Sequence, residues 1–235
     1  MRINKYLAEC GVCSRRNADK LIESGKVYIN GKRATLGEEV REGKDTVEVD
    51  GKILQHVETL QYFMLNKPKG CVCTVSDDKG RKTVMDFMPK DKGRLYPVGR
   101  LDYDTEGLLI ITNDGELTER LTHPRNEVPK TYLVKVEGSL SADALNRLRT
   151  GVEIEPRVMV KAKSLKPVEL TKAFSKFEIT ISEGKNREIR RMFEAVGHEV
   201  QFLKRIKLGD LRLGGLDRGQ YRKLSEAEVN YLKNI

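Results

Sequence analysis

The stretch Pro97–Thr112, PVGRLDYDTEGLLIIT, joins a polar loop to an apolar segment. Its second half contains the continuous apolar run Leu108–Ile111, whose length and β-branched content predict a strand inside a core. Its first half contains glycine, arginine and three acidic residues, which predict a loop. A loop held against a core strand can fix a side chain in place and leave it accessible, so this stretch predicts a functional site.

Asp102 is the reactive group that we expect this loop to present. Arg100, two residues earlier, supplies a positive charge that could contact an anionic substrate or neutralise a neighbouring group. The alternative is that Asp102 or Asp104 makes only a side-chain to backbone turn. The loop by itself leaves both interpretations open.

The composition predicts a folded chain that binds a polyanion. Its 235 residues are 34% charged and 38% hydrophobic, enough for one large domain or for a small and a medium one. The 44 Lys and Arg exceed the 35 Asp and Glu, and the net charge of +9 is interspersed along the chain. We expect nucleic acid rather than a membrane as partner, because no apolar run approaches the roughly 18–20 residues of a membrane span. The start, MRINKYLAECG, lacks the apolar core of a signal peptide, so we expect a cytoplasmic protein.

The cysteine and histidine residues give little support to a metal site or to catalysis by these residue types. The cysteines Cys10, Cys13, Cys71 and Cys73 could form a four-thiolate zinc site with C-x-x-C and C-x-C spacing. We favour reduced, partly buried thiols instead, because the two pairs fall in different predicted domains. The chain has only three histidines, which gives little support to a histidine-rich metal site or a histidine-centred triad.

Residues 1–51 predict a small domain of two helices on a hairpin sheet. The first helix ends at Gly11, and the second begins with Ser14 as its N-cap and ends at Gly25. Tight turns are predicted at Asn30-Gly31 and Asp50-Gly51.

Basic residues gather around the second helix and the first turn of this domain. They are Arg15, Arg16, Lys20, Lys26, Lys32 and Arg33. Such a cluster is typical of a surface that binds RNA phosphates. The alternative is a solvated helix face, since Asp19 and Glu23 share this side.

This domain is followed by a predicted linker, residues 52–60, and then by a second domain, residues 61–235. Hydrophobic periodicity is lost across 52–60, which marks the linker. Tyr62–Leu65 then predicts a strand, and the loop after it begins with Lys67-Pro68-Lys69-Gly70. The segment Lys130–Val136 alternates apolar and polar residues, as a half-buried strand does.

An arginine-rich helix is predicted in the segment EGKNREIRRMFEAVGH, residues 183–198. Its apolar residues recur at helical spacing, and Gly197 ends it. Arg187, Arg190 and Arg191 lie on the other side. Three guanidinium groups in one turn repel each other unless an anion or a carboxylate lies between them, so this helix predicts an anion site, or else a solvated basic face.

Several of these segments together resemble a known family. They are KPKG (Lys67–Gly70), GRLDYDTEGLL (Gly99–Leu109), KTYLV (Lys130–Val134), EGKNREIRRMF (Glu183–Phe193) and LKRI (Leu203–Ile206). In this order they resemble the RsuA/RluB/RluE/RluF family of ribosomal RNA pseudouridine synthases, over essentially the whole chain. The segment SRRNADKLIESGKVYINGKRA, residues 14–34, resembles the alpha-L RNA-binding motif.

The resemblance implies an α+β fold with a small N-terminal alpha-L RNA-binding domain and a catalytic domain with a mixed, mostly antiparallel central sheet. It implies conversion of a chosen uridine to pseudouridine without metal or cofactor. Asp102 matches the family's catalytic aspartate, Tyr132 the tyrosine that stacks on the target base, and Arg190 the arginine that pairs with the aspartate. Leu203 matches a leucine of the pocket.

The target uridine must leave its helix to be reached, so base flipping is expected. Lys67, Arg100 and the arginine helix are then expected to hold the flanking phosphates. The partner is ribosomal RNA or a ribosomal precursor particle, and we expect a monomer. GRLDYDTEGLLIITNDGEL and the RluF-like N-terminal domain favour large-subunit RNA over small-subunit RNA. A non-catalytic ribosome-associated protein is the alternative from another class.

Overall fold

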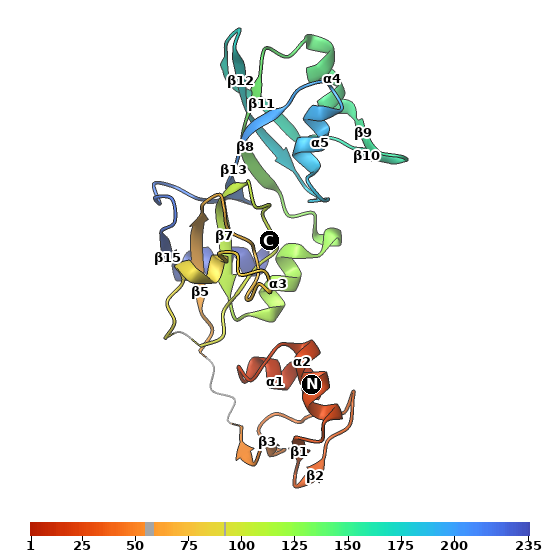
Figure 1. Cartoon of the computed structure of the whole chain (residues 1–235), viewed down its shortest axis with the longest axis vertical. Helices are drawn as coiled ribbons and strands as arrows, with labels where there is room; N and C mark the ends of the chain where they lie inside the picture. The colour runs from red at the N-terminus through yellow and green to blue at the C-terminus, as the bar shows by residue number, and fades with distance from the viewer. Residues whose placement is uncertain (55–58, 92) are drawn as a thin grey trace. The chain divides into compact units, whose positions relative to one another are not determined.

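The computed structural model describes residues 1–54, 59–91 and 93–235 (Figure 1). The chain forms two compact units, Met1–Leu60 with Lys90–Arg94, and Gln61–Pro89 with Leu95–Ile235. Within the segment 52–60 that was predicted as a linker, Lys52–Ile53 instead forms a short strand because it pairs with Val47–Val49. Residues 55–58 of that segment lie outside the described residues.

The first unit has the two predicted helices and a four-stranded sheet of order β2-β1-β3-β4. Its elements are α1 (Ile3–Glu9), α2 (Arg15–Glu23), β1 (Val27–Ile29), β2 (Lys32–Arg33), β3 (Val47–Val49) and β4 (Lys52–Ile53). Ser14 caps α2 by accepting a hydrogen bond from the Asn17 amide at 3.2 Å, as its residue type predicts. Asn30 and Gly31 both have positive φ angles, 50° and 75°, which the tight β1–β2 turn requires.

The second unit is built on a nine-stranded sheet whose main path runs β11-β12-β8-β13-β7-β5-β15. Its strands are β5 (Tyr62–Lys67), β6 (Tyr96–Pro97), β7 (Glu106–Thr112), β8 (Lys130–Glu137), β11 (Ser164–Leu170), β12 (Phe174–Ile181), β13 (Val200–Leu208), β14 (Leu211–Arg212) and β15 (Tyr221–Lys223). Strands β7 and β13 pair in parallel and the other pairs are antiparallel. The predicted mixed, mostly antiparallel sheet is confirmed.

The parallel junction of β7 with β13 depends on Gly107. Gly107 lies opposite Arg205 in the register, and a Cβ atom added to it would lie 2.2 Å from the Arg205 carbonyl oxygen. Its φ of 108° is also one that residues with side chains rarely adopt. Glycine therefore lets the two backbones approach at the point where the sheet joins its two halves.

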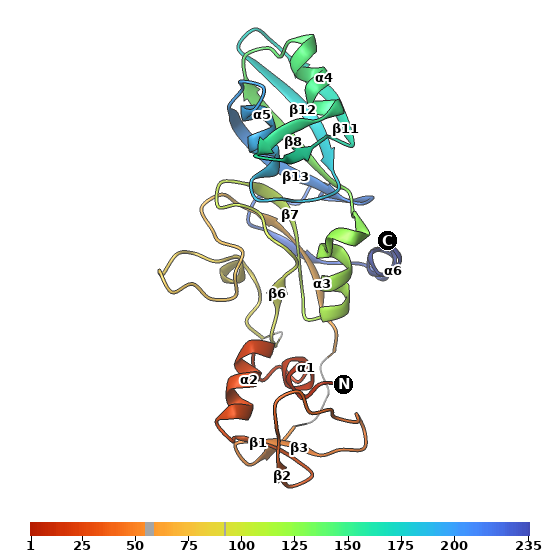
Figure 2. The same ribbon diagram turned by 90° about the vertical axis from the view of Figure 1, so that its right-hand side faces the viewer.

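The helices of this unit bury apolar faces in two clusters. Helices α4 (Ala142–Thr150) and α5 (Glu188–Glu194), with the hairpin β9 (Val152–Glu155) and β10 (Val158–Val160), pack on the half of the sheet formed by β8, β11, β12 and β13 (Figures 1 and 2). Helices α3 (Gly115–Thr122) and α6 (Glu226–Asn234) pack together on the other half. The short helices η1 (Val84–Phe87) and η2 (Pro124–Asn126) complete the unit.

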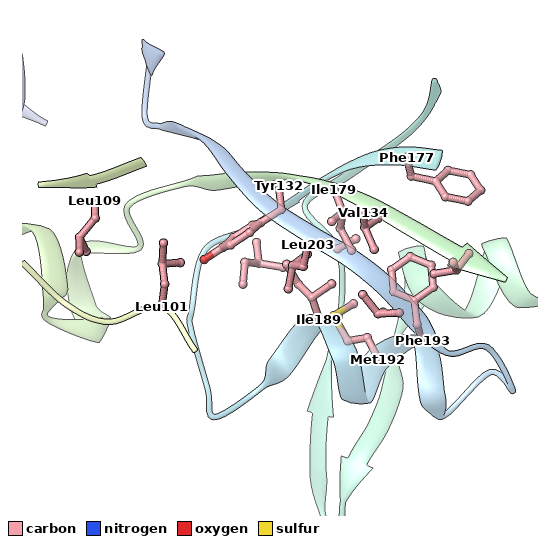
Figure 3. Packing of buried hydrophobic residues seen from close by; sticks show 14 of the residues in the cluster. Leu101, Leu109, Tyr132, Val134, Phe177, Ile179, Ile189, Met192, Phe193 and Leu203 are labelled. Atoms are coloured by element: carbon pink, nitrogen blue, oxygen red, sulfur yellow. The ribbon is translucent and has the colours of Figure 1, made fainter. Parts of the chain in front are cut away.

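The predicted apolar stripe of the arginine-rich segment lies inward on α5. Ile189, Met192 and Phe193 are at most 3% exposed and pack against the sheet near Leu203 (Figure 3). A sheet-facing stripe of this kind removes apolar surface from water and fixes the rotation of the helix. The arginines of the same segment are therefore left on the opposite side.

The two cysteine pairs lie in different units, Cys10 and Cys13 in the first and Cys71 and Cys73 in the second. Burial raises the pKa of the Cys71 and Cys73 thiols. Across residues 1–54, 59–91 and 93–235, no group of three or more His, Cys, Asp or Glu side chains could hold a metal ion. In the same residues, no helix combines the length and the apolar character that a membrane crossing needs.

Candidate active site

A cavity of about 400 Å³ in the second unit is lined by five of the eight site residues predicted for that unit. Its lining comes from the loop 98–105 before β7, the start of β8, the loop 183–187 before α5, and β13. The segments are distant in the sequence, and the order β7-β13-β8 brings them together. Asp102, Tyr132, Arg100, Arg187 and Leu203 all line this cavity.

Asp102 lies in the loop between β6 and β7, with its side chain 33% exposed. Its carboxylate Oδ2 lies 3.9 Å from Nη1 of Arg187. Its carbonyl oxygen accepts hydrogen bonds from the Thr105 amide at 3.1 Å and from Nζ of Lys67 at 3.0 Å. The backbone of the loop is thus fixed while the carboxylate faces the cavity, next to one exposed cation.

Lys67 does not hold a phosphate, contrary to the prediction, because it is fully buried. Its ammonium donates to the carbonyl oxygens of Pro68, Asp102 and Thr105 at 3.1, 3.0 and 2.9 Å. Three carbonyl groups satisfy all three donors of a lysine. Lys67 therefore positions the Asp102 loop from beneath.

Arg190 also differs from the prediction, since its ion pair goes to Asp104 rather than to Asp102. Nη2 of Arg190 lies 3.1 Å from Oδ2 of Asp104 and donates to the Asp104 carbonyl oxygen at 3.2 Å, and Nη1 donates to the Val200 carbonyl oxygen at 2.9 Å. The side chain is only 12% exposed. Arg190 thus anchors the loop two residues beyond Asp102.

Arg187 occupies the place beside Asp102 that Arg190 was expected to fill. It precedes α5 as the N-cap residue, with a left-handed φ of 50° that is uncommon outside glycine. Its guanidinium lies 3.3 Å from Oδ1 of Asp104 as well as 3.9 Å from Asp102. The carboxylate that was expected between the arginines of this segment is therefore Asp104. Arg191, by contrast, turns away to pair with Glu155 on β9.

Tyr132 lies on β8, opposite Arg205 of β13, and is 7% exposed. Its ring extends toward Leu101, with Leu203 beside it (Figure 3). Leu101 and Leu203 are 6% and 4% exposed, so the ring lies at the closed, apolar end of the cavity. This end offers a flat aromatic face and aliphatic walls, which suit a planar base.

Two further residues of the cavity were not predicted. Nζ of Lys130 donates to the carbonyl oxygens of Val128, Ser182 and Glu183 at 3.0, 3.3 and 2.8 Å. The buried carboxylate of Glu188 accepts from the amides of Gly184 and Lys185 at 2.9 and 2.7 Å. Together these bonds hold the loop that carries Arg187.

The role of Glu188, but not that of Lys130, could have been predicted from neighbouring residues in the sequence. Glu188 follows Gly184 by four residues at the start of the predicted helix, where a carboxylate can bond to free amides. The contacts of Lys130 span 52 and 53 residues of sequence and leave no local pattern. Burial lowers the pKa of Lys130 to about 8, and the nearby Arg205 adds to this effect.

The basic residues of the first unit are exposed as predicted. Arg15, Arg16 and Lys20 lie on α2 with solvent-facing side chains. Lys26 is also exposed and lies 3.7 Å from the Asp50 carboxylate. This face of α2 leaves three cations free to meet phosphate groups.

Comparison with known proteins agrees with this arrangement. Residues 61–195 match the family model described as RNA pseudouridylate synthase, and residues 1–47 match the S4 domain. A crystal structure of a pseudouridylate synthase, 34% identical, covers 99% of both chains with a TM-score of 0.69.

The similarity to curated relatives extends over the whole chain. Ribosomal large subunit pseudouridine synthase B of Bacillus subtilis is 46% identical over 236 residues, covering 100% of this chain and 96% of the relative. Dual-specificity RNA pseudouridine synthase RluF of Escherichia coli K12 is 39% identical over 231 residues, covering 97% and 77%. The chain belongs to the RsuA/RluB/RluF family of RNA pseudouridine synthases.

Proposed function

We propose that this protein converts one specific uridine of large-subunit ribosomal RNA to pseudouridine, with Asp102 as the reactive group. The observation that carries the proposal is the position of the Asp102 carboxylate. It lies in a cavity 3.9 Å from the Arg187 guanidinium, and the same cavity ends on the ring of Tyr132. One carboxylate, one cation and one aromatic face are the groups that the isomerisation needs.

The reaction exchanges one glycosidic bond for another. The bond from ribose C1′ to uracil N1 breaks, the base turns in place, and a bond from C1′ to C5 forms. The proton leaves C5 and one is gained at N1, so atoms and charge balance without a cofactor. A carboxylate serves as nucleophile or as base in such a sequence. The positive charge of Arg187 attracts the Asp102 carboxylate at this distance.

Tyr132 and Leu203 hold the base while it turns. The phenol ring supplies a stacking face, and its hydroxyl can exchange a proton with the ring carbon. Leu203 and Leu101 exclude water from the same end of the cavity because they are almost fully buried. An apolar pocket of this kind also lowers the cost of taking the base out of its helix.

Cations at the mouth of the cavity hold the RNA backbone. Arg100 and Lys185 are exposed and line the cavity beside Arg187. On the first unit, the exposed residues Arg15, Arg16, Lys20 and Lys26 supply sequence-independent contacts to phosphates. The protein acts in this proposal as a cytoplasmic monomer on ribosomal RNA or a precursor particle.

Mapping pseudouridine tests the proposal directly. Ribosomal RNA from cells that lack this protein is incubated with the purified protein or with its Asp102→Asn variant, and pseudouridines are then located by chemical mapping. We expect one new site in the large-subunit RNA with the wild type and none with the variant. A new site confined to the small-subunit RNA, or none at all, would refute the proposed target.

A further inference from the structure

Tyr103 is an exposed aromatic residue directly after Asp102. The residue lines the same cavity and is 53% exposed, the most of any aromatic residue in the described ranges. Isolated exposed apolar residues are common on protein surfaces and need no ligand. This one lies at the rim of a cavity that also contains a candidate reactive carboxylate.

The backbone on both sides of Tyr103 is fixed. Its own carbonyl oxygen accepts a hydrogen bond from the Gly70 amide at 2.9 Å. Asp102 before it is held by Lys67, and Asp104 after it is held by Arg187 and Arg190. The ring is thus presented to solvent from a rigid support, so a partner would lose little conformational entropy on binding it.

The surroundings of this ring match a nucleic-acid partner. Arg100, Lys185 and Arg187 are exposed and line the same cavity as Tyr103. A groove that combines cations for the backbone with an aromatic face for a base is how proteins bind unpaired nucleotides. An apolar peptide would gain nothing from these charges.

We propose that Tyr103 stacks on the base of the nucleotide next to the target uridine. The inference rests on the proposed function, because it takes the cavity to receive an extruded uracil. Tyr132 and Leu101, 7% and 6% exposed, form the closed end where that uracil fits. Tyr103 lies at the open rim, so the base that reaches it belongs to a neighbour in the strand.

This contact defines the kind of site that the enzyme accepts. Stacking tolerates all four bases but requires that the neighbouring base be free of its own helix. The substrate is therefore a uridine in a loop or bulge with an unpaired nucleotide beside it. A uridine flanked by paired bases on both sides is a poor substrate.

Fluorescence can report the contact directly, since the chain contains no tryptophan. Tyr103→Trp introduces a single indole, whose emission is quenched when a base stacks on it. The control is Leu170→Trp on β11, because Leu170 is similarly exposed, at 58%, and lies outside the cavity lining. The probe is protein-free total ribosomal RNA from cells that lack this protein. We expect quenching for Tyr103→Trp only; equal quenching in both variants, or none in either, overturns the inference.

Kinetics on a short RNA around the mapped uridine supply a second test. We expect Tyr103→Ala to lower kcat/KM by about 5- to 150-fold, the range that one stacked base gives, and Tyr103→Phe to retain activity within about twofold. An abasic nucleotide at the stacked position should lower kcat/KM of the wild type by the same factor. It should not lower kcat/KM of Tyr103→Ala any further. Full activity of Tyr103→Ala, or equal abasic losses in both proteins, overturns the inference.

The two tests separate this inference from the proposed function. If the wild type forms no pseudouridine in ribosomal RNA, the proposed function fails, and the fluorescence comparison still decides whether Tyr103 stacks on RNA. If the wild type is active and Tyr103→Ala equals it, the proposed function stands and the stacking role is wrong.

Discussion

Arg190 forms its ion pair with Asp104, at 3.1 Å, and leaves Asp102 to Arg187. The two arginines lie three positions apart on one helical segment but differ in burial, with side chains 12% and 45% exposed. A buried guanidinium with fixed partners supports the loop, whereas an exposed one is available to substrate. Of these two arginines, Arg190 therefore anchors the loop and Arg187 lines the cavity.

Replacing each arginine by glutamine should separate these roles. Arg190→Gln removes hydrogen bonds from a mostly buried guanidinium to the Val200 and Asp104 carbonyl oxygens, so we expect a loss of about 1–3 kcal/mol in the free energy of unfolding. Arg187→Gln should change that free energy by less than about 0.5 kcal/mol but lower the single-turnover rate constant at least about tenfold. Urea unfolding and single-turnover pseudouridine formation measure the two quantities. Equal destabilisation by both changes would contradict the division.

Asp102→Asn tests the assignment of the reactive group. The amide keeps the size of the side chain and removes its charge, so we expect pseudouridine formation to fall by more than about 10³-fold. Binding of ribosomal RNA, measured by filter binding, should remain within about twofold, because the basic surfaces are untouched. An active Asp102→Asn protein would end the assignment.

Tyr132→Phe separates stacking from proton transfer. The ring is retained in its buried position beside Leu203, so the variant should fold with an unchanged melting temperature. Loss of the hydroxyl should slow the chemical step about 10²- to 10⁴-fold, the usual contribution of general acid–base catalysis. Rapid-quench measurement of the single-turnover rate gives the answer. A rate equal to that of the wild type would leave the ring with a stacking role alone.

The partly buried ammonium of Lys130 should make stability depend on pH. Burial lowers the pKa of Lys130 from 10.5 to about 8, so between these pH values the folded protein binds fewer protons than the unfolded chain. Stability from this group therefore rises with pH across that window and is constant below it. We expect the free energy of unfolding of the wild type, relative to Lys130→Met, to increase from pH 8 to pH 10 in urea titrations. A flat or falling difference would contradict the lowered pKa of Lys130.

The basic face of α2 should contribute to the salt dependence of RNA binding. The triple change of Arg15, Arg16 and Lys20 to alanine removes three exposed cations. If each contacts a phosphate, the slope of log Kd against log salt should fall by about 2–3. Alanine at the exposed Lys161, Lys166 and Lys172 is the charge-matched control and should leave the slope nearly unchanged. An equal fall in both triple variants would make the effect one of net charge.

Local patterns in the sequence predicted the elements of the site better than its contacts. The strand after Asp102, the apolar stripe of α5 and the cap at Ser14 follow from neighbours a few residues away. The burial of Lys67 depends on carbonyl groups up to 38 residues distant, and the choice between Arg187 and Arg190 spans more than 80 residues. Which arginine lies beside Asp102 depends on the left-handed backbone at Arg187 and on the packing of α5. A short stretch of sequence does not contain this information.

The order of strands has a consequence for the size of the opening in which the uracil must rotate. Asp102 leads into β7 and Tyr132 lies on β8, and β13 alone separates these strands in the sheet. Backbone hydrogen bonds therefore set the separation of β7 and β8 at two ladder steps, about 4.8 Å each, and Tyr132 lies across β13 from Gly107, five residues after Asp102. The sheet therefore fixes the width of the cavity at a value that suits one flat ring. A change of target site is then expected at the rim of the cavity, where side chains can change without altering the spacing of β7 and β8.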